Sequence, residues 1–202
     1  MSKHKSLSCS AHTIQLCIED SLKACSNIQD ILKKSERIVK FFKKLNIGYK
    51  QFVKAQRKLG RKELLQNVQT RWNSEFYMLQ RVHENKNPLK LGLSNFTQLP
   101  TISADDWLAV DELIDVLAQV EAATRILCGS KYSTISTVIP FVQNISNEIT
   151  SMNFKSKVIL KFRACLKKSI QERFDHIETN KVLNVATLLD PRFKKGMFYP
   201  IV

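Results

Sequence analysis

One stretch of the sequence places an arginine beside a tryptophan directly before an apolar helical pattern, at Arg71 and Trp72. Apolar residues follow Trp72 at the four-then-three spacing of a single helix face, at Phe76, Leu79 and Val82. A tryptophan in this position is either an anchor of the hydrophobic core or a side chain that stacks on a nucleic-acid base. Asn73 or Ser74 can cap the predicted helix, and the sequence leaves both roles of Trp72 open.

Thiol and imidazole groups near the start of the sequence raise the question of metal binding, since zinc in proteins is held by cysteine and histidine. Cys9 and His12 have the spacing of one ligand pair, and Cys17 follows them. A structural zinc site needs a second closely spaced pair, which the sequence lacks, so we expect no metal and no cofactor. The five cysteines are an odd number, which favours reduced thiols in the cytosol or nucleus.

The charge of the chain indicates polyanionic partners. The formal net charge is +14 over 202 residues, which favours nucleic acid and, after it, an acidic membrane surface. Residues 1–65 hold 15 Lys and Arg against 5 Asp and Glu. Six of these basic residues fall within one predicted helix, largely on the side away from its apolar residues: Lys33, Lys34, Arg37, Lys40, Lys43 and Lys44. Such a surface can follow a phosphate backbone, although the same charges also suit a helix that only faces water.

The middle of the chain carries the opposite charge. Residues 101–150 hold 2 Lys and Arg against 7 Asp and Glu, whereas residues 151–202 hold 11 against 4. An acidic segment between two basic ones suggests one face for DNA and another for a protein. The sequence therefore predicts that a protein partner, if there is one, contacts residues 103–150.

The spacing of apolar residues predicts an all-α fold. Only 5 Gly and 5 Pro are present, and no alternating strand pattern of useful length occurs. No apolar run approaches the ~20 residues that cross a bilayer, so we expect no membrane partner. Residues 85–102 have turn chemistry and are predicted to form a loop, after which Ser103 caps the helix that contains the core residue Trp107. Helical patterns cover roughly residues 9–26, 27–46, 49–60, 72–82, 103–128, 140–149, 155–178 and 182–189.

Three motifs occur in order along the chain: Cys9-Ser10-Ala11-His12, then Thr70-Arg71-Trp72-Asn73-Ser74, and finally Leu188-Leu189-Asp190-Pro191-Arg192-Phe193-Lys194. Together they resemble motifs of the hAT superfamily of DNA transposases, and above all of the BED-type zinc-finger proteins derived from those transposases. Shorter matches around Ser103 and Ser136 agree in position with that family. The resemblance covers residues 7–196.

The resemblance implies a ribonuclease H-like catalytic core that is interrupted by a large helical insertion. It assigns residues 1–26 to a remnant of that core, residues 27–196 to the helical insertion domain and residues 197–202 to a truncated tail. The expected fold is therefore an all-α insertion domain with only a remnant of the α/β core. The apolar spacing predicts the same fold class independently.

Catalysis in this family resembles that of other transposases, in which two Asp and one Glu hold two divalent metal ions. The resemblance places both Asp before the motif at Cys9 and the Glu after Lys194, where this sequence has no acidic residue. We therefore expect that the chain lacks the catalytic set, the BED finger and the dimerisation segment, and that it cuts no DNA. Asp190 belongs to its motif without being catalytic, and we expect it to cap a helix or to pair with Arg192.

The resemblance also assigns a few contacts with DNA. Trp72 matches a tryptophan that stacks on a displaced base, Arg71 would hold a phosphate beside it, and His12 could touch the scissile phosphate, although packing is the favoured role of His12 and Cys9. The leading hypothesis is a non-catalytic, nuclear, transposase-derived protein that binds DNA with little sequence preference through its basic helical surface. The alternatives are an incomplete gene model of an active transposase and a protein-interaction module.

Overall fold

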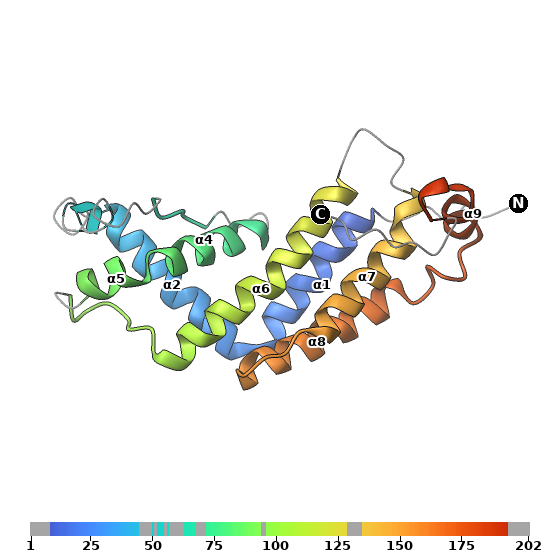
Figure 1. The fold of residues 1–202 in the computed structure, drawn as a ribbon. Helices are drawn as coiled ribbons and strands as arrows, with labels where there is room; N and C mark the ends of the chain where they lie inside the picture. Colours follow the sequence, from blue (N-terminus) through green and yellow to red (C-terminus); the bar gives the residue numbers. More distant parts are fainter. Residues whose placement is uncertain are drawn as a thin grey trace, which may run out of the picture. The chain divides into compact units, whose positions relative to one another are not determined.

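The computed structural model describes residues 9–44, 50, 52–54, 56, 63–67, 72–93, 96–128 and 135–193, and the regular elements in these ranges are all helical. The prediction of an all-α fold is confirmed. None of the described helices is long and apolar enough to span a bilayer. The labelled elements are α1 (Ser10–Ala24), α2 (Ser26–Lys44), α4 (Trp72–Glu84), α5 (Lys86–Leu93), α6 (Ala104–Leu127), η1 (Ile135–Thr137), α7 (Val138–Ser151), α8 (Lys157–Phe174), α9 (Lys181–Leu189) and η2 (Pro191–Phe193) (Figure 1).

The chain divides into two compact units. The terminal unit contains Met1–Ser21, Gln119–Asn153 and Arg163–Val202, and the central unit contains Leu22–Ala118 and Phe154–Phe162. The separate assignment of residues 1–26 to a core remnant and of residues 27–196 to an insertion domain stays a prediction.

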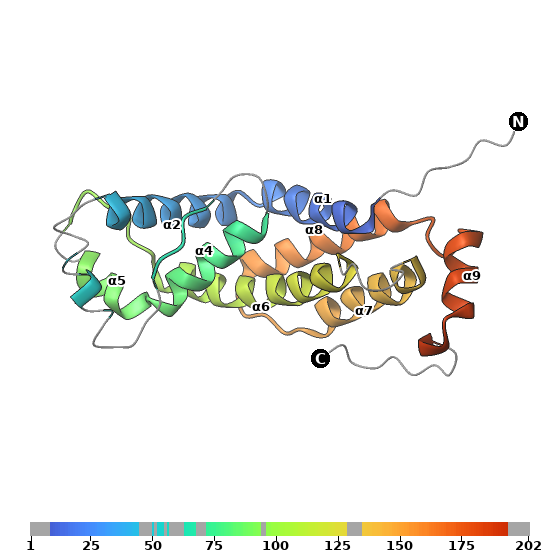
Figure 2. The same cartoon turned by 90° about the horizontal axis from the view of Figure 1, so that it is seen from above.

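The core of the central unit is built on α2 and α4, which pack side by side (Figures 1 and 2). Helical spacing places one apolar stripe on α2, and all of its residues are buried: Ile28, Ile31, Leu32, Ile38, Val39 and Phe42. The predicted stripe of α4 is buried as well: Trp72, Phe76, Leu79 and Val82. Burying such side chains contributes ~1.5–3 kcal/mol each, so these two stripes hold the unit together.

In the terminal unit, α1, α7 and α8 pack with the second part of α6. Their buried side chains surround one small void: Ile14, Cys17, Val120, Val142, Ile145, Leu166, Ile170 and Phe174. Helix α9 runs across the end of these helices (Figure 2). It contacts α7 and η1 and inserts Leu183 against Val138, Ile139 and Ile177.

The start of α6 agrees with the predicted cap. The backbone N–H of Asp106 donates to the Ser103 hydroxyl at 3.1 Å, and the Ser103 N–H donates to the Asp106 carboxylate at 3.2 Å. This reciprocal pair satisfies two amides that the first turn of the helix leaves open. Trp107 is 3% exposed, which confirms its predicted place in the core.

The predicted loop over residues 85–102 is wrong in its first part, because α5 occupies Lys86–Leu93, whereas residues 96–102 are non-helical as expected. The amide of Leu89 donates to the Asn85 carbonyl at 2.9 Å, and the Asn85 side chain donates to the Arg81 carbonyl at 2.7 Å. Asn and Pro are typical of turns but are also accepted in the first turn of a helix, and the complete burial of Leu89 favours that alternative. The helix predicted over residues 49–60 lies largely outside the described residues.

Candidate nucleic-acid interface

The candidate interface is the basic face of α2, which its amphipathic sequence places opposite the core. Successive residues turn by about 100° around a helix, so positions spaced by four, three and four share one face. Lys33, Arg37, Lys40 and Lys44 have this spacing, and all four side chains are exposed. They extend over about 16 Å of the helix at ~1.5 Å per residue. The same helix thus anchors the central unit on one side and presents a row of cations on the other.

Two of the six predicted basic contacts have partners within the protein. Lys34 is half-buried, and its ammonium lies 2.8 Å from the carboxylate of Asp106. Lys40 is exposed and pairs with Glu36 one turn earlier, also at 2.8 Å. Ion pairs within the described ranges involve none of the remaining four, which are Lys33, Arg37, Lys43 and Lys44. The face therefore keeps most of its positive charge for an external anion.

The pair between Lys34 and Asp106 has an electrostatic signature. Burial opposes ionisation of Asp106, but the hydrogen bonds from Lys34 and from the Ser103 amide outweigh it, so the pKa of Asp106 is lowered. Lys34 therefore connects α2 to the first turn of α6 within the central unit. Its charge is partly neutralised, so we expect it to contribute less to phosphate binding than Lys33.

Trp72 is the first residue of α4 and is 4% exposed. Its ring centroid lies 6.4 Å from that of Phe76, inside the apolar stripe. Arg71 lies outside the described residues. Because the helix begins at Trp72, Asn73 and Ser74 are inside its first turn and not at its cap, which corrects the prediction. The Ser74 hydroxyl instead donates to the side-chain oxygen of Asn67.

The Cys9-x-x-His12 motif forms the beginning of α1 in the terminal unit. The Cys9 carbonyl accepts the hydrogen bond of the Thr13 amide at 2.9 Å, and both Cys9 and His12 are exposed. Cys17 is completely buried, and burial raises the pKa of its thiol. Within the described ranges, no three His, Cys, Asp or Glu side chains gather where they could hold a metal ion. His12 belongs to one unit and Trp72 to the other.

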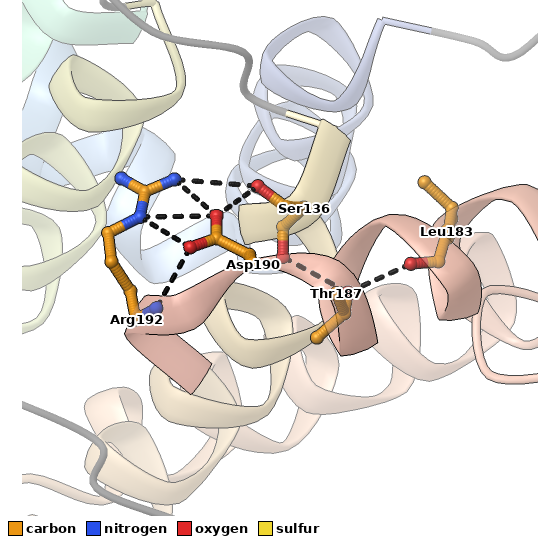
Figure 3. A network of polar contacts seen from close by, with 5 residues as sticks. All are labelled: Ser136, Leu183, Thr187, Asp190 and Arg192. Carbon is orange, nitrogen blue, oxygen red and sulfur yellow. Dashed lines mark hydrogen bonds and ion pairs between the residues drawn. The ribbon is translucent and has the colours of Figure 1, made fainter. Parts of the chain in front are cut away.

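The third motif forms a polar network in the terminal unit (Figure 3). Asp190 is the C-cap residue of α9, and its carboxylate accepts hydrogen bonds from the Arg192 guanidinium at 2.6–3.1 Å. The Ser136 hydroxyl donates to the same carboxylate at 2.6 Å. The expectation that Asp190 caps a helix and pairs with Arg192 is confirmed. Its contact with Ser136, which is 54 positions away, has no local sequence signal.

The electrostatics of this network favour a charged Asp190. The hydrogen bond from Arg192 is the main cause that holds the pKa of Asp190 well below its usual range. Thr187 adds a bond from its hydroxyl to the Ser136 carbonyl at 3.0 Å. Together these contacts tie α9 to η1, so the motif has a structural role in this unit.

Comparison with known proteins supplies the family. Residues 7–116, which include the basic face of α2 and the start of α4, match the family model described as the ZBED1 RNase-like helical domain. The chain belongs to this family. No solved structure is significantly similar to it.

The similar proteins include transposases and BED zinc-finger proteins. Zinc finger BED domain-containing protein 4 of Homo sapiens is 28% identical over 200 residues, which cover 97% of this chain and 17% of that protein. Putative AC transposase of Zea mays is 26% identical over 193 residues, covering 93% and 23% respectively. Zinc finger BED domain-containing protein RICESLEEPER 1 of Oryza sativa subsp. japonica is 23% identical over 194 residues, covering 92% and 26%. The predicted relationship to hAT-type transposases is confirmed, and the chain spans about a quarter or less of these relatives.

Beyond the ZBED1 RNase-like helical domain match, α9 exposes an apolar surface. Leu188 and Leu189 are 72% and 69% exposed, and Val182 and Val185 are 57% and 53% exposed. Leu183 is the side chain that anchors the helix, at 4% exposed. The polar contacts of Asp190 therefore fix a helix whose apolar residues are mostly in solvent.

Proposed function

We propose that this chain binds DNA through the basic face of α2 with little sequence preference, that it acts in the nucleus, and that it does not cut DNA. One observation carries the proposal: α2 packs most of its apolar side chains in the core, while Lys33, Arg37, Lys40 and Lys44 form a continuous row on its exposed side. Two of the similar proteins are named as a BED zinc-finger protein and a transposase, which is consistent with DNA as the partner.

The proposed mechanism is electrostatic. Lysine and arginine side chains that neutralise phosphates release condensed counterions, so the logarithm of the affinity falls with the logarithm of the salt concentration. Neutralising ~6 phosphates should lower the affinity by orders of magnitude between ~50 and ~200 mM salt. Phosphate contacts carry no base information, so binding should differ little between duplex sequences.

The decisive experiment compares two triple variants of equal charge change. One variant, Lys33→Gln, Arg37→Gln and Lys44→Gln, removes cations from α2. The control, Lys90→Gln, Lys161→Gln and Lys181→Gln, removes three exposed lysines from α5, α8 and α9. Each lost phosphate contact should reduce the magnitude of the salt slope by about 0.9 for duplex DNA. We expect the magnitude of the salt slope to fall by roughly three in the α2 variant and by much less in the control. Equal decreases in the two variants, or salt-independent binding, would contradict the proposal.

The proposed absence of DNA cleavage is supported by the partners of the acidic residues. Asp20 accepts hydrogen bonds from Arg173, and the Glu112 carboxylate accepts the amides of Lys155 and Ser156 at 2.7 and 3.1 Å. Carboxylates that hold two catalytic metal ions must instead converge on ions ~3.5–4 Å apart. Incubation of the purified chain with supercoiled DNA and Mg²⁺ or Mn²⁺ should leave the DNA intact. Metal-dependent nicking that is lost on mutating Asp20 or Glu112 would overturn this part.

Arg71, Trp72 and His12 remain proposed DNA contacts on the basis of the resemblance alone. For Trp72, 4% exposure means that the ring would have to leave the core in order to stack on a base. If the ring stays buried, Trp72→Ala should cost ~3–5 kcal/mol of stability. If it stacks, the variant should instead weaken binding to mismatched DNA by ~1–3 kcal/mol. A thermal melt beside a binding assay separates the two roles.

A second candidate function is favoured by the length of the relatives. The chain spans 17% of the human protein and 23% of the maize transposase, so it could be part of an active transposase. An adjacent reading frame that encodes two further aspartates and a BED finger would support that function. A protein partner at residues 103–150 is a further proposal, and capture that survives nuclease treatment and is lost in Asp105→Asn with Asp115→Asn would support it.

A further inference from the structure

The basic face of α2 contains one aromatic residue. Phe41 follows Arg37 by four positions and precedes Lys44 by three, so the three side chains share one edge of the helix. Phe41 is half-buried, whereas its neighbour Phe42 is completely buried. Part of the Phe41 side chain is therefore accessible beside two exposed cations.

A second aromatic ring meets Phe41 from another segment. Phe96 follows α5, is half-buried, and has its ring centroid 4.8 Å from that of Phe41 at an interplanar angle of 67°. Its backbone is fixed by a hydrogen bond from its amide to the Leu93 carbonyl at 3.0 Å and by another from the Leu99 amide to its own carbonyl at 3.1 Å. The pair is therefore a defined structure and not a single loose side chain.

The two rings rest on the core of the central unit. The ring centroid of Phe42 lies 5.5 Å from that of Phe41, 6.4 Å from that of Phe96 and 5.0 Å from that of the buried Phe52. Phe42 and Phe52 are buried in the core, so Phe41 and Phe96 rest on packed side chains. A rigid aromatic surface beside cations is the arrangement with which proteins bind single-stranded nucleic acid: cations hold the backbone and rings stack on bases.

We propose that Phe41 and Phe96 form a stacking platform for unpaired bases, so that this face takes single-stranded DNA in addition to duplex. The inference rests on the proposed binding of DNA by α2. Bases inside a duplex are already stacked and cannot reach the rings, so the platform contributes only to strands with unpaired bases. It offers unpaired bases two half-buried rings, whereas the ring of Trp72 is buried.

The first test uses Phe41→Leu combined with Phe96→Leu, which removes both aromatic faces and keeps apolar volume. Affinity is measured for an oligothymidine and for a duplex of the same length, at fixed salt. We expect the oligothymidine affinity to fall roughly fivefold or more, because each stacked base contributes a factor of this size or greater, while duplex affinity stays within about twofold. Phe154→Leu is the control. Phe154 is also half-buried in the central unit, but it lies outside the basic face of α2, next to Lys155, whose amide donates to Glu112. If the double variant leaves the ratio of oligothymidine affinity to duplex affinity unchanged, the platform is wrong. That includes an equal loss of affinity for both DNAs.

The second test keeps an aromatic ring in the platform and reads binding from fluorescence. Phe41→Trp keeps an aromatic ring at the platform and adds a fluorophore, while Trp72 and Trp107 are 4% and 3% exposed. Oligothymidine should quench the added fluorescence, and duplex DNA should leave it nearly unchanged. Equal quenching by both would contradict the platform.

The two proposals fail in different ways. If the native protein binds neither DNA in a salt-dependent manner, the function of the α2 face is wrong. If it binds both, and Lys33→Gln, Arg37→Gln and Lys44→Gln weaken both, but the Phe variants change neither, only the platform is wrong. A thermal melt of each variant confirms that the loss comes from binding and not from unfolding.

Discussion

Helices α2 and α9 divide polar and apolar residues in opposite ways. Most of the apolar side chains of α2 are buried, and most of its basic side chains are exposed. On α9, only Leu183 is buried, the carboxylate of the capping Asp190 is engaged by Ser136 and Arg192, and most of the apolar residues are exposed. The core therefore determines the position of α2, whereas polar contacts at one end contribute much of what holds α9. For α2 the exposed side is free for a polyanion without any change in the fold.

The largest predicted difference is in stability. Phe42→Ala removes a completely buried ring from α2 and should lower the free energy of unfolding by ~3–5 kcal/mol. Leu188→Ala removes an apolar side chain that is 72% exposed on α9 and should change it by less than ~0.5 kcal/mol. Urea unfolding of both variants provides the comparison. A large loss in Leu188→Ala would show that its side chain is buried in solution.

A smaller effect is expected at the cap of α9. Asp190→Asn removes the charge that attracts Arg192 and should weaken the attachment of α9 by about 1–2 kcal/mol, since Arg192 is half exposed. Hydrogen exchange of the amides of residues 183–189 should become faster, while the amides of α2 should not change. If both helices exchange faster, the network supports more than α9.

The same network gives a pH dependence with a defined sign. The pKa of Asp190 is lowered in the folded protein mainly by the hydrogen bond from Arg192, whereas an unfolded Asp titrates near ~3.9. The stability that ionised Asp190 contributes is therefore complete above about pH 4. It is lost as the pH falls further toward the pKa of Asp190 in the folded protein. The difference in α9 exchange between native protein and Asp190→Asn should be full at pH 6 and smaller at pH 3. A difference that grows on acidification would contradict the assignment.

The smallest predicted effect concerns the one acid that pairs within the basic row. Glu36→Gln releases Lys40 and removes a negative charge from α2. Exposed pairs of this kind contribute ~0.3–0.5 kcal/mol, so stability should hardly change while duplex affinity rises roughly twofold at low salt. Glu172→Gln, which releases Lys168 on α8, is the control and should leave affinity nearly unchanged. Weaker binding in Glu36→Gln would mean that Lys40 must be held in place by Glu36 in order to act.

Local patterns in the sequence predicted local structure well. The inward residues of α2 follow from helical spacing, and the pairing of Asp190 with Arg192 follows from two residues separated by a proline. Two contacts join residues far apart in the sequence: Lys34 with Asp106, 72 positions apart, and Ser136 with Asp190, 54 positions apart. No local sequence pattern predicts either contact. The sequence does not predict α5, because Asn87 and Pro88 occur both in turns and in first turns of helices, and the burial of Leu89 depends on the rest of the unit. The Phe41–Phe96 platform depends on a similar long-range contact.

The most direct test of the central claim is chemical modification of lysines with and without duplex DNA at low salt. Lys33, Lys43 and Lys44 on α2 and Lys181 on α9 are all exposed, so all four should react in the free protein. Bound DNA should slow acetylation of the three α2 lysines strongly and that of Lys181 very little, as measured by mass spectrometry. Equal protection of Lys181, or no protection of the α2 lysines at saturating DNA, would contradict the assignment of the interface to α2.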